Sequence, residues 1–259
     1  NATQAGQNVV IGYHAGSGDT REDSGTEVAW TGDYCTIIGH DACQAIEGND
    51  SNHNTVIGFE GGNALTTGHS NTLVGSTAGD TLTTGDENVI IGYNNDAEGV
   101  NTNRANGLGQ GIISVQDYTT VGNGSNDIRA AHGNITWATV SDQRFKKDIE
   151  TSTAGLSFIE DLRPVTYKWK SKGEIPDWSR AYEEGSEEQF KNSKHNHGFI
   201  AQEVKQAIDN HSEIKDGFSM WYELSGEGSQ QEIGETALVP ILVKAIQELS
   251  AKVKALEDA

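Results

Sequence analysis

A six-residue phrase recurs five times along residues 8–97 of this 259-residue chain. Each copy has an Asn or another small residue, three residues of high β-propensity, a Gly and a turn residue. The copies that begin at Asn54, Asn71 and Asn88 are seventeen residues apart, and segments 65–68 and 82–85 both read Leu-Thr-Thr-Gly. A fixed period of this kind indicates internal repetition. The five copies lie at 8–13, 35–40, 54–59, 71–76 and 88–93.

The residue types in the phrase predict stacked β-strands. Short runs of Val, Ile and Thr favour strands, while Gly and Asn at fixed offsets supply corners with positive φ. One repeat is too short to bury its own apolar face, so it must stack on its neighbours as a β-solenoid or β-roll. Large side chains are few, and association of several chains would complete the burial. We expect equivalent inward positions for Ile11, Ile38, Ile57, Val74 and Ile91.

The two halves of the chain differ in charge. Residues 1–140 hold three basic and sixteen acidic residues, whereas residues 141–259 hold fifteen and twenty-two. The net charge of −20 argues against a nucleic-acid partner, because neutralising phosphates requires clustered Lys and Arg. No run approaches the ~20 apolar residues of a membrane helix, so no membrane insertion is expected. The first residue lies inside a repeat, and we interpret the chain as a fragment of a longer protein.

The other features of residues 1–140 are interpreted as structural rather than as catalytic or metal-binding sites. Cys35 and Cys43 lack metal-ligand spacing and are interpreted as small buried side chains, with a disulfide as the alternative. Linkers 19–33 and 44–52 are expected to be surface loops, with receptor contact as the alternative. Calcium-binding Gly-Gly-x-Gly-x-Asp phrases do not occur, and two Thr-Thr pairs are too few for an ice-binding face.

Residues 101–140 lose the repeat and are expected to form a β-structured neck. Beyond Val140 the pattern changes to a helix at 153–162 that Pro164 ends, a half-buried strand at 165–170 and a second helix that opens at Gly198. Residues 171–197 are charged and loop-like.

The C-terminal segment carries apolar residues at spacings of 3 and 4. This heptad seam predicts a coiled-coil helix, and Pro240 is tolerated because it falls in the first turn. A seam of about two and a half heptads is marginal alone and needs partner helices or the domain body. The seam residues are Val239, Leu242, Ile246, Leu249, Val253 and Leu256.

Two resemblances unite these features. The repeat is similar to the left-handed β-roll head of trimeric bacterial adhesins, a module also found in phage tail fibres. The Ser-Asp-x-Arg-x-Lys phrase at 141–146, Pro-Val-Thr-Tyr-Lys-Trp at 164–169, Gly-Phe-Ile-Ala-Gln-Glu-Val at 198–204 and the terminal heptads resemble the intramolecular chaperone auto-processing domain of phage tailspikes and fibres. The expected organisation is a β-roll over 1–100, a neck over 101–140 and an α+β chaperone domain over 141–259 that ends in a trimeric coiled coil.

The second resemblance implies a single-turnover serine peptidase. The domain would trimerise, template the upstream fibre and cut the Val140–Ser141 bond, with Ser141 as nucleophile and Lys146 as base. The residues allow this, since a lysine can serve as base if burial or a nearby cation lowers its pKa. Asp142, Arg144 and Lys147 are the charged neighbours, of which Asp142 and Arg144 are the supporting candidates. Without the resemblance, such a serine beside a basic run would be interpreted as an ordinary surface residue.

Three classes of function remain at this stage. The first is an assembly protein of a virion tail fibre, made in the host cytoplasm, that cuts itself once. The second is a structural fibre tip or bacterial surface adhesin that keeps its chaperone domain as a cap. A carbohydrate-degrading tailspike would need a paired-carboxylate site, and none can be identified. No cofactor or metal is expected, because His195 and His197 lack helical ligand spacing. The expected partners are two further copies, upstream fibre segments and, as an open alternative, a host receptor.

Overall fold

The computed structural model describes residues 7–18, 32–47, 51–214, 218–225 and 228–259. The chain divides into two compact units, residues 1–146 and 147–259, and each is described by itself. Most of the linker expected at 19–33, and residues 48–50 of the one at 44–52, lie outside the described residues. Among the helices of the described ranges, none is long and apolar enough to cross a bilayer.

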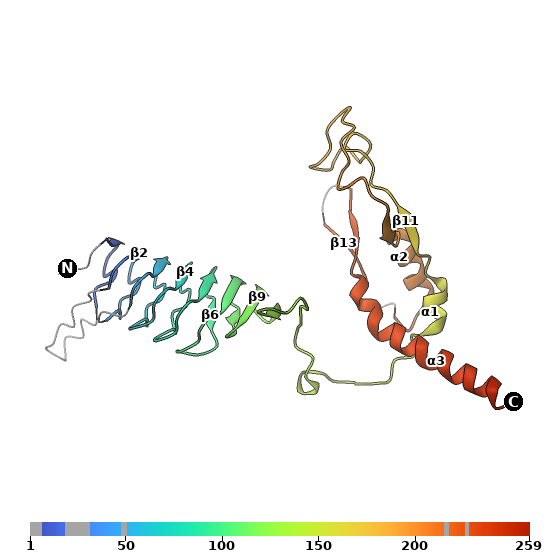
Figure 1. The fold of residues 1–259 in the computed structure, drawn as a ribbon, viewed down its shortest axis with the longest axis horizontal. Coiled ribbons are helices and arrows are strands. Elements are labelled where there is room, and N and C mark those ends of the chain that lie inside the picture. Colours follow the sequence, from blue (N-terminus) through green and yellow to red (C-terminus); the bar gives the residue numbers. More distant parts are fainter. Residues whose placement is uncertain (1–6, 19–31, 48–50, 215–217, 226–227) are drawn as a thin grey trace. The chain divides into compact units, whose positions relative to one another are not determined.

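The first unit is a β-solenoid whose strands stack along one direction (Figure 1). Seven strands pair in parallel in the order β1-β2-β3-β4-β5-β7-β9, and β10 closes the sheet antiparallel to β9. The repeat phrases thus form the successive rungs of one sheet, as the sequence predicted. The strands are β1 (Val9–Ile11), β2 (Thr36–Ile38), β3 (Thr55–Ile57), β4 (Thr72–Val74), β5 (Val89–Ile91), β7 (Asn106–Gln110), β9 (Tyr118–Asn123) and β10 (Asn126–Ala131), with a smaller pair β6 (Asp96–Ala97) and β8 (Ile113–Ser114).

In β2 to β5 the middle residue of each triplet faces the solenoid core. Ile37, Val56, Leu73 and Ile90 are fully buried, whereas the residues on either side of each are at least partly exposed. The five residues expected to point inward are indeed equivalent in register, but they lie on the outer face, so that part of the prediction is wrong. The reason is the two-residue period of a strand, which places the third residue opposite to the second. The residues that lie on the outer face, contrary to the prediction, are Ile11, Ile38, Ile57, Val74 and Ile91.

A column of buried asparagines joins the rungs. The Asn54 amide donates to the Gly68 carbonyl at 2.9 Å, and its Oδ1 accepts the backbone N–H of Asn71 at 2.9 Å. Asn71 and Asn88 repeat these contacts one rung further on. Because every polar group of the column is paired with a neighbouring rung, burial of the asparagines fixes the register of the stack.

The glycine after each triplet is required by close approach of the rungs. At Gly39 and Gly58 φ is +148° and +150°, and a Cβ built on either would lie 2.0 Å from the carbonyl oxygen of the next rung's glycine. No L-residue fits this geometry, which explains why Gly occupies this place in all five phrases.

The second unit is a small α+β fold (Figure 1). The hairpin-like pairs β11–β12 and β13–β14 are each antiparallel, and a core around Phe158, Val204, Met220 and Ile241 joins helices to strands. The first two helices are shorter than expected, and Gly198 belongs to a strand rather than to a helix start. The elements are α1 (Leu156–Asp161), β11 (Val165–Tyr167), β12 (Asn196–Gly198), α2 (Ala201–Asn210), β13 (Trp221–Glu223), β14 (Gln231–Ile233), a 3₁₀ turn η2 (Glu235–Leu238) and α3 (Val239–Glu257).

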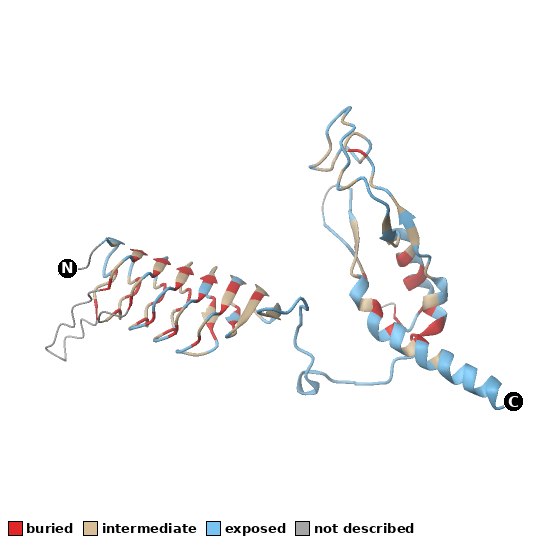
Figure 2. Ribbon diagram, viewed as in Figure 1, coloured by how far each residue is buried: buried red, intermediate tan, exposed pale blue. Residues whose placement is uncertain are grey.

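Helix α3 has two different faces. Ile241 and Ala245 are buried against the core of its own unit, while the six residues of the heptad seam are exposed (Figure 2). The C-terminal half of the helix projects beyond the core, and its residues after Glu248 are exposed. The architecture expected from the sequence is confirmed at this level: a β-solenoid followed by an α+β unit that ends in a helix.

Candidate active site

The segment that follows Val140 folds into one tight turn. Asp142 has extended backbone angles and caps the 3₁₀ turn η1 (Gln143–Phe145), because its side chain accepts the N–H of Arg144 at 2.8 Å. The N–H of Lys146 then donates to the Gln143 carbonyl at 3.0 Å. This capped turn brings the two ends of the segment, Ser141 and Lys146, together.

The turn places the two expected catalytic side chains in contact. The Nζ atom of Lys146 donates to Oγ of Ser141 at 2.8 Å. This is the separation across which a hydroxyl proton can pass to an uncharged amine. Both residues are exposed in the single chain, and so is Val140 on the other side of the bond between 140 and 141.

Arg144 is held by the cap residue rather than by the dyad. Its guanidinium binds Asp142 in a bidentate manner, with Nη2 2.6 Å from Oδ2. The hydrogen bond with Arg144 lowers the pKa of the Asp142 carboxyl, and the same bond raises the pKa of the guanidinium. Arg144, the cation that the sequence places near Lys146, is therefore already paired with the Asp142 carboxylate.

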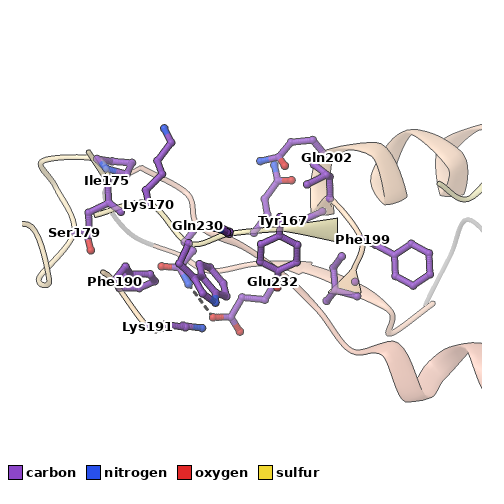
Figure 3. A pocket seen from close by; sticks show the side chains of 18 of the residues that line it. Tyr167, Lys170, Ile175, Ser179, Phe190, Lys191, Phe199, Gln202, Gln230 and Glu232 are labelled. Atoms are coloured by element: carbon purple, nitrogen blue, oxygen red, sulfur yellow. Dashed lines mark hydrogen bonds between the residues drawn. The ribbon is translucent and has the colours of Figure 1, made fainter. Parts of the chain in front are cut away.

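A second candidate site in the α+β unit was not predicted. It is a cavity of about 870 Å³ beside β11 and β14 (Figure 3). Trp169 lies between Tyr167 and Phe190, with ring centroids 5.2 and 5.6 Å away, and the Lys191 ammonium lies 4.4 Å from its centroid. Gln230 donates to Glu232 at 3.0 Å at its edge. Alternation in the sequence after Pro164 predicted that Tyr167 and Trp169 share a face, although β11 ends at Tyr167. Phe190 comes from a loop without any periodic signal.

A third cluster surrounds His211 in the same unit. Its Nε2 lies 2.9 Å from Asp161 Oδ2 and its Nδ1 lies 3.0 Å from Glu213 Oε1, so both ring nitrogens face carboxylates. Hydrogen bonds to Asp161 and, to a smaller extent, to Glu213 raise the pKa of the His211 imidazole. The hydrogen bond with His211 lowers the pKa of the Glu213 carboxyl. Phe158 packs edge-on against the ring at 5.3 Å. The arrangement is a buried histidine that ties α1 to the end of α2.

The remaining expectations concern metals and thiols. His195 and His197 are exposed, and His197 is part of strand β12 opposite Thr166. Within the described ranges, no group of three or more His, Cys, Asp or Glu side chains is placed to hold a metal ion. Cys35 and Cys43 are both buried, free thiols. Burial raises the pKa of each, so both stay protonated and unreactive in the folded protein.

Comparison with known proteins gives one family. The sequence model described as chaperone of endosialidase matches residues 141–213. Neither the curated proteins nor the solved structures gave a match. The match begins at Ser141, the first residue of the turn that carries the Ser-Lys pair. It confirms the resemblance stated from the sequence: the region from 141 to 213, which follows a β-solenoid, is similar to the chaperone of endosialidase.

Proposed function

We propose that this chain is the C-terminal part of a phage-type tail fibre whose α+β domain acts as an intramolecular chaperone. In this proposal the domain brings three chains together, templates the solenoid and is then cut from it at Val140–Ser141. The observation that carries the proposal is the 2.8 Å contact between Ser141 and Lys146 at the first residue of the family match. The domain limits that go with it are 1–100, 101–140 and 141–259.

The cut would proceed in two balanced steps. Oγ of Ser141 attacks the carbonyl carbon of Val140 and gives its proton to the uncharged Lys146 amine. The bond from that carbon to the Ser141 nitrogen breaks, and the nitrogen takes up the proton, which leaves Val140 as an ester on Oγ. Water then adds to the ester carbonyl and the bond to Oγ breaks. The products are a carboxylate on Val140 and a free amine with a restored hydroxyl on Ser141. The attacking hydroxyl belongs to the same chain or to a neighbouring copy.

Association of chains would supply what one chain lacks. An exposed amine is held in its charged form by water, and burial is the change that favours the uncharged form. The exposed seam of α3 offers a surface for such association, because six large apolar side chains in a heptad pattern face solvent. The outer face of the solenoid adds a second apolar row, from Ile11 to Leu108. Cleavage would then follow trimer formation rather than precede it.

The alternative is a fibre tip that keeps the domain as a permanent cap. One observation favours it: the Ser-Lys pair is exposed, and the guanidinium of the neighbouring Arg144 is bound to Asp142. In both cases the proposed partners are two further copies of the chain and the upstream fibre. The proposed location is a virion tail fibre, and the alternative location for a protein that keeps the cap is the bacterial cell surface. Contact with a host receptor belongs to the same proposal.

Denaturing electrophoresis of the purified chain separates the two. Self-cleavage predicts two fragments, residues 1–140 and 141–259, and a full-length band for Ser141→Ala. A new amino terminus at Ser141, read by mass spectrometry, would locate the cut. If Ser141→Ala is cut at the wild-type rate, an outside protease is responsible, and if wild type stays whole, the cap is the function.

A further inference from the structure

The chain that leads to the Val140–Ser141 bond is bound to the end of the solenoid. After β10 it turns at Gly133, where φ is +81°, and Asn134 closes the turn by donating to the Ala131 carbonyl at 2.9 Å. Thr136 donates to the Asn134 side chain at 2.5 Å and starts the return. The returning segment then runs antiparallel to β10.

Three hydrogen bonds fix this returning segment to β10. Arg129 and Ala138 exchange backbone N–H to carbonyl bonds, both 2.8 Å long. The Thr139 hydroxyl donates to the Asp127 carbonyl at 3.0 Å. Only Val140 separates these contacts from the bond that Ser141 would attack. The upstream side of that bond is therefore held by β10, just as its downstream side is held by the turn that Asp142 caps.

The strand that accepts these bonds depends on a completed solenoid. Asp127 is 7% exposed and pairs with Arg129 at 2.8 Å. It packs on Gly122 of β9 so closely that a Cβ there would lie 2.6 Å from the Asp127 Cα. β9 in turn pairs in parallel with β7, the preceding rung. The acceptors on β10 are thus in place only when the last rungs have stacked.

The geometry points to Thr139 as a positioning residue for self-cleavage: with Ala138 it presents the Val140 carbonyl to Ser141 only after the β9–β10 hairpin has formed. This inference rests on the proposed function. Holding the Ser141 hydroxyl and the Val140 carbonyl in place lowers the barrier, because less conformational freedom is then lost on reaching the transition state. An unfolded or slipped stalk end would leave the carbonyl free to move, and the cut would be slow. Cleavage would in this way report that the end of the stalk is folded.

The same contacts predict the form of the product. After the cut, residues 136–140 remain with the stalk, joined to the open edge of β10 by the isolated Arg129–Ala138 bridge. An uncovered edge is a template for pairing with other chains, and a bound strand protects it. The segment that positions the bond before the cut therefore serves as the cap of the stalk after it.

The test compares Thr139→Val with Thr139→Ser in the full chain. Val keeps the shape and removes the donor, whereas Ser keeps the donor. We expect Thr139→Val to cut about three- to tenfold more slowly than wild type and Thr139→Ser to cut within about twofold of it, since one hydrogen bond is worth that much. Trimer yield and thermal unfolding should be the same in all three, because Thr139 is exposed.

A second variant removes the backbone donor. Ala138→Pro lacks the N–H that binds the Arg129 carbonyl and should slow the cut at least as much as Thr139→Val. Equal rates in wild type, Thr139→Val and Ala138→Pro would overturn the positioning role while leaving self-cleavage intact. A wild-type chain that is never cut overturns both proposals. Slow cutting in Thr139→Val with recovery in Thr139→Ser supports the role of the hydroxyl.

Discussion

The sulfur of Cys35 accepts the backbone N–H of Asn54 at 3.3 Å, the contact that an asparagine Oδ1 makes one rung further along. Its thiol also reaches the Ser51 carbonyl at 3.3 Å, where the asparagines place their amide donors. Cys35 therefore stands in the buried asparagine column as a substitute with one weak donor and one weak acceptor.

This relationship predicts opposite effects of two substitutions. Cys35→Ala should lower the free energy of unfolding by about 1–3 kcal/mol, because the Asn54 N–H loses its acceptor in a buried site. Cys35→Asn should be at least as stable as wild type. Cys43→Ala is the control, because it removes a buried thiol for which no hydrogen bond is recorded among the described residues. Thermal and urea unfolding measure all three, and a Cys35→Asn chain less stable than Cys35→Ala would contradict the substitution.

Val56 faces the solenoid core and Ile57 faces outward, so substitutions at these two adjacent positions should have different effects. Val56→Asp places an unpaired charge in the core and should prevent stacking of the rungs. Ile57→Asp alters a side chain that is 39% exposed, so the rungs should still stack. If the outer face joins chains, Ile57→Asp should reduce trimer yield while circular dichroism retains its β signal. Light scattering with dichroism checks both, and equal loss of β signal in the two variants would contradict the register.

Helix α3 predicts a separation between folding and association. Ile246 is 65% exposed on the seam. If α3 joins three chains as proposed, Ile246→Asp should yield monomers without unfolding the core around Phe158. Ala251→Asp, on the helix surface opposite the seam, is the matched control. Analytical ultracentrifugation at micromolar concentration distinguishes the states. A wild-type monomer under these conditions would exclude a three-stranded α3 bundle.

The roles of two neighbouring lysines should differ. Lys146→Ala should leave a full-length chain, because removal of a base costs orders of magnitude in rate. Lys147→Ala should cut at nearly the wild-type rate, because the contact with Ser141 is made by Lys146. Time courses on denaturing gels measure both rates, and equal blocks in both lysine variants would count against the dyad.

The His211 cluster predicts a pH-dependent stability of the α+β unit. Its folded-state pKa is raised by Asp161 and Glu213, so the imidazolium contributes stability that is complete below the ordinary value near 6.5 and is lost as pH rises through the raised pKa. Glu213, whose pKa is lowered, contributes stability that is lost as pH falls through its own folded value. Stability should therefore decline on both sides of mildly acidic pH.

Chemical unfolding across pH 4–9 measures this dependence. His211→Gln should flatten the decline on the alkaline side, whereas His197→Gln, at an exposed position, should leave the profile unchanged. An alkaline decline of the same size in His211→Gln would assign it to other groups.

Local sequence signals were sufficient for some of these features and not for others. The strand triplets, their common register and the terminal helix follow from period and heptad spacing. The facing of the triplets did not, because phrases such as Ile37-Ile38 are apolar at both positions and offer no contrast between core and surface. The Ser141–Lys146 contact is local and depends on the cap that Asp142 provides. The His211 cluster joins residues 50 positions apart, and the Arg129–Ala138 bridge is one residue pair in a segment without periodicity, so neither could be predicted from a pattern.

The equal spacing of Asn54, Asn71 and Asn88 has an evolutionary consequence. Every seventeen-residue rung offers the same groups to the rung before it and the rung after it. A duplicated rung would therefore enter the stack without a new interface and lengthen it by about 4.8 Å, one strand spacing. Point changes at Gly58 are blocked by the neighbouring carbonyl, but whole-block duplications and deletions are not. Recombination can therefore change the length of such a stalk more easily than the residues on its surface.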